Sequence, residues 1–155
     1  SEVNLLVIHN ISLPPGQFGT PYIEQFFQNN LSCDEHPYFK TIQDLRVSAH
    51  LLIKRDGSII QFVPFDKRAW HAGESSFNGQ DNCNDFSIGI ELEGEDNRPY
   101  TDRQYEVLVE VTVTLMAAYP GINQQRIQGH SDIAPARKTD PGPAFNWPYY
   151  LKQLP

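Results

Sequence analysis

Apolar residues occur along this chain in short runs separated by segments rich in Pro and Gly. The run Asn4–His9 (NLLVIH) precedes SLPPGQFGTP, which predicts a buried strand followed by a loop. From 21 to 29, four large apolar residues recur at helical spacing. This spacing predicts a helix that Thr20 caps and that has Pro21 at its first position.

A second set of apolar runs predicts extended structure. The segments Arg46–Ile53 and Ser58–Phe62 flank an Asp-Gly step, which favours a tight turn and therefore a β-hairpin. Ser87–Glu93 (SIGIELE) alternates large apolar residues with small or acidic ones. Glu91 and Glu93 then share the face opposite the isoleucines, because side chains of a strand alternate between its faces. That face is a candidate lining for a site.

The C-terminal third contains the longest predicted helix. Thr101 and Gln104 form a capping box, and apolar residues at helical spacing continue to Pro120-Gly121, where the helix ends. A short apolar segment at Ile127, a non-repetitive loop and a final helical turn within Phe145–Leu154 follow. Strands mixed with helices predict an α/β fold, a central mixed β-sheet flanked by helices.

Composition narrows the classes of protein that fit. A length of 155 residues with 39% hydrophobic residues fits one soluble domain, residues 1–155, which we expect to be a monomer. The 12 Lys and Arg against 19 Asp and Glu argue against nucleic acid as a partner. Neither a membrane-spanning apolar run nor a signal-peptide pattern is present, which favours a cytoplasmic protein without a membrane partner. Cys33 and Cys83 are expected as free thiols, with a single disulfide as the alternative.

The segment Gly129–Gly142 (GHSDIAPARKTDPG) concentrates candidate chemistry in one loop. It contains His130, Lys138 and Asp140, two potential metal ligands and a cation. A hydrolytic zinc site needs three N or O ligands, an open position and a way to stabilise the developing anion. His9, at the end of a predicted buried strand, is a candidate third ligand. Spacing alone leaves the zinc site a hypothesis, because a lone His is more often a hydrogen-bonded core or surface residue.

Other polar residues have both a structural and a functional interpretation. Glu91 is either an acid on a solvent-facing strand or a base that takes a proton from the attacking water. Lys138 is either a solvated charge or the cation beside an oxyanion, and Arg137 is either a surface residue or a fork for a substrate carboxylate. Trp70 and His71 either pack in the fold or, in the case of Trp70, stack on a sugar ring.

Six motifs in a fixed order identify a family resemblance that covers nearly the whole chain. They are LLVIHNISLPPG, HPYF, RVSAHLLIKRDG, VPFDKRAWHAG, CNDFSIGIELEG and GHSDIAPARKTDPG. Together they resemble the AmpD-type anhydro-N-acetylmuramyl-L-alanine amidases, within the wider amidase and peptidoglycan-recognition-protein superfamily. Several long motifs in the right order are far more specific than one short pattern.

The resemblance implies a fold of the amidase and peptidoglycan-recognition-protein type and assigns roles at matching positions. The implied ligands of one zinc ion are His9, His130 and Asp140. Glu91 matches the catalytic glutamate, Lys138 the cation that stabilises the tetrahedral intermediate, and Tyr38 a tyrosine of the catalytic site. The implied substrate contacts are Asn10, Arg46, Trp70 and Arg137.

The resemblance also implies a reaction. It is hydrolysis of the amide between the lactyl group of anhydro-N-acetylmuramyl peptides and L-alanine, in cell-wall recycling. Two alternatives remain at this point: intact peptidoglycan as the substrate, and a module that binds peptidoglycan fragments without cutting them. The presence of all five candidate metal and catalytic residues favours the enzyme over the binding module.

Overall fold

A five-stranded sheet forms the centre of the fold in a computed structural model that describes residues 2–155. Its strand order is β3-β2-β6-β1-β7. The strands are β1 (Leu5–Ile11), β2 (Leu51–Ile53), β3 (Ile59–Gln61), β6 (Ser87–Glu93) and β7 (Ile127–Gly129). Four of them run parallel and β3 runs antiparallel to β2, which confirms the predicted mixed sheet.

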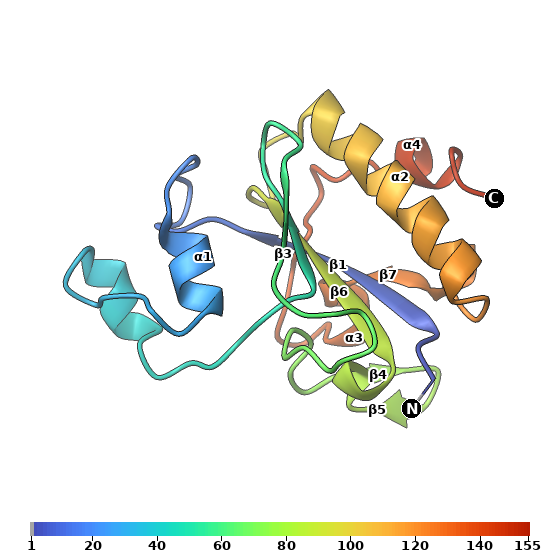
Figure 1. The fold of residues 1–155 in the computed structure, drawn as a ribbon, viewed down its shortest axis with the longest axis horizontal. Helices are drawn as coiled ribbons and strands as arrows, with labels where there is room; N and C mark the ends of the chain where they lie inside the picture. Colours follow the sequence, from blue (N-terminus) through green and yellow to red (C-terminus); the bar gives the residue numbers. More distant parts are fainter. Residues whose placement is uncertain (1) are drawn as a thin grey trace.

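The two central strands, β1 and β6, send alternate side chains to opposite faces of the sheet. On one face, α2 (Asp102–Ala118) and α4 (Trp147–Leu151) cover the isoleucines of β6 (Figure 1). On the other face, Leu5 and Val7 pack against Phe86 and against α3 (His130–Ile133). Because both faces are covered, all seven residues of β6 are buried. The interpretation of Glu91 as an acid on a solvent-facing strand is therefore wrong.

The segment that connects β1 to β2 forms a lobe at one side of the sheet (Figure 1, blue to cyan). It contains α1 (Tyr22–Phe27) and the 3-10 helix η1 (Pro37–Thr41), packed around an apolar cluster of its own. The predicted helix is confirmed, but its predicted cap is wrong. Thr20 donates its hydroxyl hydrogen bond to the carbonyl of Leu13, and Pro21 occupies the N-cap position without a side-chain bond.

Other predicted elements are present with changed bounds. The hairpin β2–β3 is confirmed, although its strands are shorter than predicted. The capping box of α2 is present, with Gln104 N donating to Thr101 Oγ1 at 3.1 Å. The predicted loop from 129 to 142 instead begins with the end of β7 and the single turn of α3.

Besides η1 and α3, further short elements were not predicted. They are β4 (Ser76–Phe77), β5 (Gln80–Asp81) and the 3-10 helices η2 (Cys83–Asp85) and η3 (Gln124–Arg126). Cys33 and Cys83 are both free thiols. Across residues 2–155, no helix has the length and apolarity needed to cross a bilayer.

Candidate metal centre

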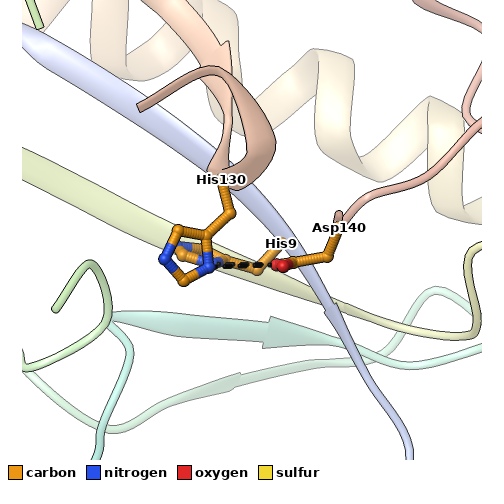
Figure 2. Close-up of side chains that lie close together, drawn as sticks. All are labelled: His9, His130 and Asp140. Atoms are coloured by element: carbon orange, nitrogen blue, oxygen red, sulfur yellow. Dashed lines mark hydrogen bonds and ion pairs between the residues drawn. The ribbon is translucent and has the colours of Figure 1, made fainter. Parts of the chain in front are cut away.

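Three side chains from distant parts of the sequence converge beside the central parallel strands (Figure 2). His9 lies on β1, opposite Glu91 of β6 in the strand register. His130 comes directly after β7, which pairs with the other edge of β1. Asp140 lies ten residues further, where the chain passes back over the same site. The carboxyl ends of parallel strands lie at one edge of a sheet, and ligand sites of α/β folds gather there.

The three candidate ligand atoms are spaced as a zinc ion would space them. His9 Nδ1 lies 3.0 Å from His130 Nδ1 and 3.2 Å from Asp140 Oδ2. The third distance, from His130 Nδ1 to Asp140 Oδ2, is 3.3 Å. Tetrahedral zinc with metal–ligand bonds of about 2.0–2.1 Å places its ligand atoms about 3.3 Å apart. The spacing therefore fits one zinc ion.

The protonation of the three side chains suits a cation as well. His130 donates its Nε2 proton to the carbonyl of Ala72 at 2.9 Å, so Nδ1 of the neutral ring carries a lone pair. Burial lowers the pKa of His9, which favours its neutral ring. Burial raises the pKa of Asp140, but the imidazoles of His130 and His9 lower it by more, so this carboxyl is ionised. Two neutral imidazoles and a carboxylate are a common ligand set of hydrolytic zinc sites.

Glu91 faces this cluster from the neighbouring strand. Its Oε2 lies 3.9 Å from His9 Nδ1, and among residues 2–155 nothing donates a hydrogen bond to its Oε1. Burial and then the charge of Asp140 raise the pKa of Glu91 well above its usual value, against the opposing effect of Lys138. Such a carboxyl takes up a proton readily, which is the property of a general base.

A cavity of about 830 Å³ opens from the cluster. Arg137 and Lys138 contribute to its polar lining, and Phe26, Ile42 and Val47 belong to its apolar lining, which comes from the β1–β2 lobe. The cavity therefore offers cationic groups beside the candidate ligands and an apolar surface further from them.

The predicted catalytic and substrate-contacting residues differ in where the structure places them. Tyr38 and Trp70 are exposed and line the cavity, with 56% of Trp70 accessible. Arg137 lines it too, and its Nη2 donates to backbone carbonyls at 72 and 74. Arg46 is not brought to the cavity, because its Nη1 donates to carbonyls of the adjacent segment 43–45.

Asn10 lines the cavity, but its side-chain amide has internal partners. Its Nδ2 lies 2.7 Å from Asp96 Oδ1, 3.0 Å from Tyr100 Oη and 3.2 Å from the carbonyl of Pro141. Asp96 also accepts a hydrogen bond from Thr139 Oγ1. The Asn10–Asp96 contact thus connects β1 to the loop that contains Asp140, the candidate aspartate ligand. The sequence analysis does not identify Asp96, because this residue lies in none of the recognised motifs.

A second residue that the sequence does not identify is His71, for which it indicates only packing. Its ring is buried and contacts His9, with His9 Nε2 2.9 Å from His71 Nδ1. The sequence contains one sign of this arrangement. Gly89 interrupts the apolar strand β6, and a Cβ there would lie 2.4 Å from the Cγ of His71. A glycine inside a strand often marks such a close approach.

Comparisons with known proteins identify the family of this chain. Residues 1–143 match the family described as N-acetylmuramoyl-L-alanine amidase. The chain is 63% identical to the 1,6-anhydro-N-acetylmuramyl-L-alanine amidase AmpD of Enterobacter cloacae, over 97% of this chain and 80% of that protein. A crystal structure of a Se-Met AmpD derivative superposes with a TM-score of 0.97 at 56% identity, covering 100% of this chain and 86% of the other.

A more distant structure contains a ligand. It is the N-acetylmuramyl-L-alanine amidase AmiD from Escherichia coli in complex with the substrate anhydro-N-acetylmuramic acid-L-Ala-D-gamma-Glu-L-Lys. Its TM-score is 0.73 at 30% identity, over 97% of this chain and 57% of that chain. The fold is therefore shared well beyond the closely similar sequences.

Proposed function

Because this chain belongs to the N-acetylmuramoyl-L-alanine amidase family, we propose that it is a zinc-dependent amidase of anhydro-muropeptides. The scissile bond is the amide between the lactyl group of the anhydro-muramic sugar and L-alanine, and residues 1–155 form the catalytic domain. The observation that carries the proposal is the convergence of His9, His130 and Asp140 beside the buried carboxyl of Glu91. The names and bound substrate of the relatives support the choice of bond.

His9, His130 and Asp140 would hold one zinc ion through two nitrogens and one oxygen. When bound, zinc acts as a Lewis acid on the amide carbonyl and makes water a better nucleophile. The raised pKa of Glu91 suits it to accept a proton as water attacks the carbonyl carbon. Glu91 then returns this proton to the nitrogen of L-alanine as the C–N bond breaks, which leaves a lactyl carboxylate and a free peptide amine.

Lys138 supplies positive charge to the same region. It lines the cavity, and its charge lowers the pKa of Glu91, which means that the two groups interact. A fixed cation beside the carbonyl stabilises the negative oxygen that forms when water adds.

Tyr38 lines the cavity as well and is proposed as a further group of the catalytic site. Asn10, Trp70 and Arg137 line it and are the proposed substrate contacts, whereas Arg46 would need to reach the substrate from outside the lining.

Soluble fragments suit this protein better than intact peptidoglycan. A formal charge of −7 gives little long-range attraction to an anionic wall polymer. The relatives that carry AmpD names are also named for the 1,6-anhydro-N-acetylmuramyl group, the sugar of the anhydro-muropeptide proposed here as substrate. We therefore propose a role in cell-wall recycling, as a cytoplasmic monomer.

The test combines a metal analysis with mass spectrometry. Purified protein should contain one zinc ion per chain and release free tripeptide from anhydro-N-acetylmuramyl tripeptide. Incubation with intact sacculi should release much less stem peptide under the same conditions. Comparable cleavage of both substrates would overturn the preference for soluble fragments. Absence of both zinc and free tripeptide would favour a module that binds peptidoglycan fragments without cutting them.

A further inference from the structure

The nitrogen of His9 that points away from the candidate metal position has an unusual partner. Metal-bound histidines usually donate their second ring N–H to a carboxylate, a backbone carbonyl or water. His130 follows this pattern, with Nε2 bonded to the carbonyl of Ala72. His9 Nε2 instead lies 2.9 Å from another imidazole nitrogen, Nδ1 of His71.

This contact bears on which nitrogen of His9 carries its proton. A neutral imidazole has one N–H and one lone pair, and only the lone pair can bind a metal. For Nδ1 of His9 to face the metal with a lone pair, the proton must lie on Nε2. His71 Nδ1 is the acceptor in line with that proton, and both rings are buried.

His71 can act as this acceptor because its other nitrogen has a partner too. Its Nε2 lies 3.0 Å from the hydroxyl of Ser87, which is buried and can accept the ring N–H. The three groups then form a continuous chain in which His9 donates to His71 and His71 donates to Ser87. Every ring nitrogen of the chain except Nδ1 of His9 is satisfied within the protein.

The backbone around His71 is held in place from both sides. Asn84 is buried, and its Oδ1 accepts hydrogen bonds from the N–H of His71 at 3.1 Å and of Ala72 at 2.8 Å. The absent side chain at Gly89 leaves the space that the His71 ring fills. One short segment, residues 71–72, therefore presents the acceptor for His9 and also the carbonyl that binds His130.

We propose that His71 is a positioning residue of the metal centre, which fixes the orientation and tautomer of His9 by accepting its Nε2 proton. The inference rests on the proposed zinc site and adds to it. His71 lines the cavity but is not one of the three candidate ligands, so its proposed effect on the metal passes through His9. The nearby His50 has no such role, because its nitrogens bond to the N–H of Gly89 and the carbonyl of Lys67.

The experiment compares zinc affinity in four proteins by competition with a chromophoric chelator. His71→Phe removes the acceptor, and we expect a loss of about 10-fold to 100-fold in affinity, as for other residues that support a metal ligand. His71→Asn should restore most of that affinity, because its side-chain oxygen can occupy the place of Nδ1. His50→Phe removes another buried imidazole, one with no hydrogen bond to His9, and should retain the affinity of the parent.

Melting temperatures of the metal-free proteins separate positioning from general destabilisation. The proposal predicts that His50→Phe lowers the melting temperature without weakening zinc binding. Equal zinc affinity in the parent and in His71→Phe, or equal losses in His71→Phe and His50→Phe, would contradict it. A parent protein that binds no zinc would instead overturn the proposed function on which the inference rests.

Imidazole ¹⁵N NMR of the zinc-loaded parent gives a readout that does not depend on any variant folding. We expect the His9 proton on Nε2 and a deshielded, hydrogen-bonded signal that correlates with His71 Nδ1. A His71 proton found on Nδ1 would show that His71 donates rather than accepts, and the proposal would be wrong.

Discussion

Among individual residues, Glu91 has the surroundings that conflict most with its charge. It is buried, one carboxylate oxygen has no hydrogen-bond donor among residues 2–155, and Asp140 adds a second negative charge nearby. The protein tolerates this cost at the position that we propose transfers a proton. Strongly shifted carboxyl groups concentrate at catalytic sites for this reason.

The proposed roles predict different results for two acidic residues. Asp140→Ala removes a proposed ligand and should lose zinc and activity together. Glu91→Gln keeps the shape of the side chain but cannot take up a proton. It should retain zinc while kcat falls by about 10²-fold to 10⁴-fold. Zinc content and turnover measured on the same samples test both, and a fully active Glu91→Gln protein would exclude the mechanism.

The raised pKa of Glu91 also predicts how the stability of the metal-free protein depends on pH. Below the unfolded pKa the carboxyl is protonated in both states and costs nothing. As pH rises toward the folded pKa, the unfolded state ionises first, so folding loses stability. Metal-free Glu91→Gln should therefore melt higher than the parent at pH 7, with the difference vanishing near pH 4. A difference that grows toward low pH would contradict the direction of the shift.

At the scale of elements, β6 divides its side chains between two tasks. Its isoleucines complete the core under α2, while Ser87, Gly89 and Glu91 face the site. One strand thus supplies a hydroxyl for His71, the space for its ring and the proposed base. Both faces of β6 therefore need particular residue types, apolar ones toward α2 and Ser, Gly and Glu toward the site.

The requirement for space at Gly89 can be tested directly. Gly89→Ala places a Cβ 2.4 Å from His71 Cγ, and overpacking of this kind typically costs about 1–3 kcal/mol of stability. The displaced ring should also weaken zinc binding. Ile90→Val, on the opposite face of the same strand, should cost about 0.5–1.5 kcal/mol and leave zinc affinity unchanged. Denaturant unfolding and metal titration of both variants check this contrast.

The loop 138–142 is an element positioned by side chains and not by regular structure. Asp96 accepts hydrogen bonds from Asn10 and Thr139, and its backbone carbonyl accepts one from Ala144 N at 2.9 Å. Asp96→Ala should therefore destabilise the protein by about 1–3 kcal/mol and lower zinc affinity, because Asp140 loses its support. Asp102→Ala, at the exposed start of α2, is a control for loss of one acidic charge. Zinc affinity equal to the control would show that the loop holds without Asp96.

At the scale of the whole molecule, the proposed zinc ion would connect three parts of the fold. His9, His130 and Asp140 come from β1, α3 and the following loop, so a bound ion favours only the folded chain. Free zinc at 100 times its Kd would stabilise the fold by about 2.7 kcal/mol. Chelation should lower the melting temperature, and added zinc should restore it. An unchanged melting temperature would mean that no tight metal site joins these segments.

Local patterns were enough to predict the main elements. Periodicity identified β1, β6 and α2, and the capping box at Thr101 marked where α2 begins. These features follow from interactions between neighbours in sequence, which is why they can be found without coordinates. The motif order was sufficient for the family, since it does not depend on contacts. The cap predicted at Thr20 failed because its hydroxyl bonds to Leu13 instead, a choice that depends on how the loop folds back.

Tertiary structure alone decided how the site is supported. His9 and His71 are separated by 62 residues, and Asn10 and Asp96 by 86, so neither contact follows from a local pattern. Gly89 marks only the close approach of the His71 ring to β6. The sequence by itself determined which residue types are available for zinc chemistry and which strands and helices carry them. The fold determined that Asn10 bonds within the protein, that Arg46 stays outside the cavity lining, and that His71 faces His9. Hydrogen bonding is directional and short in range, so only the packed chain selects its partners.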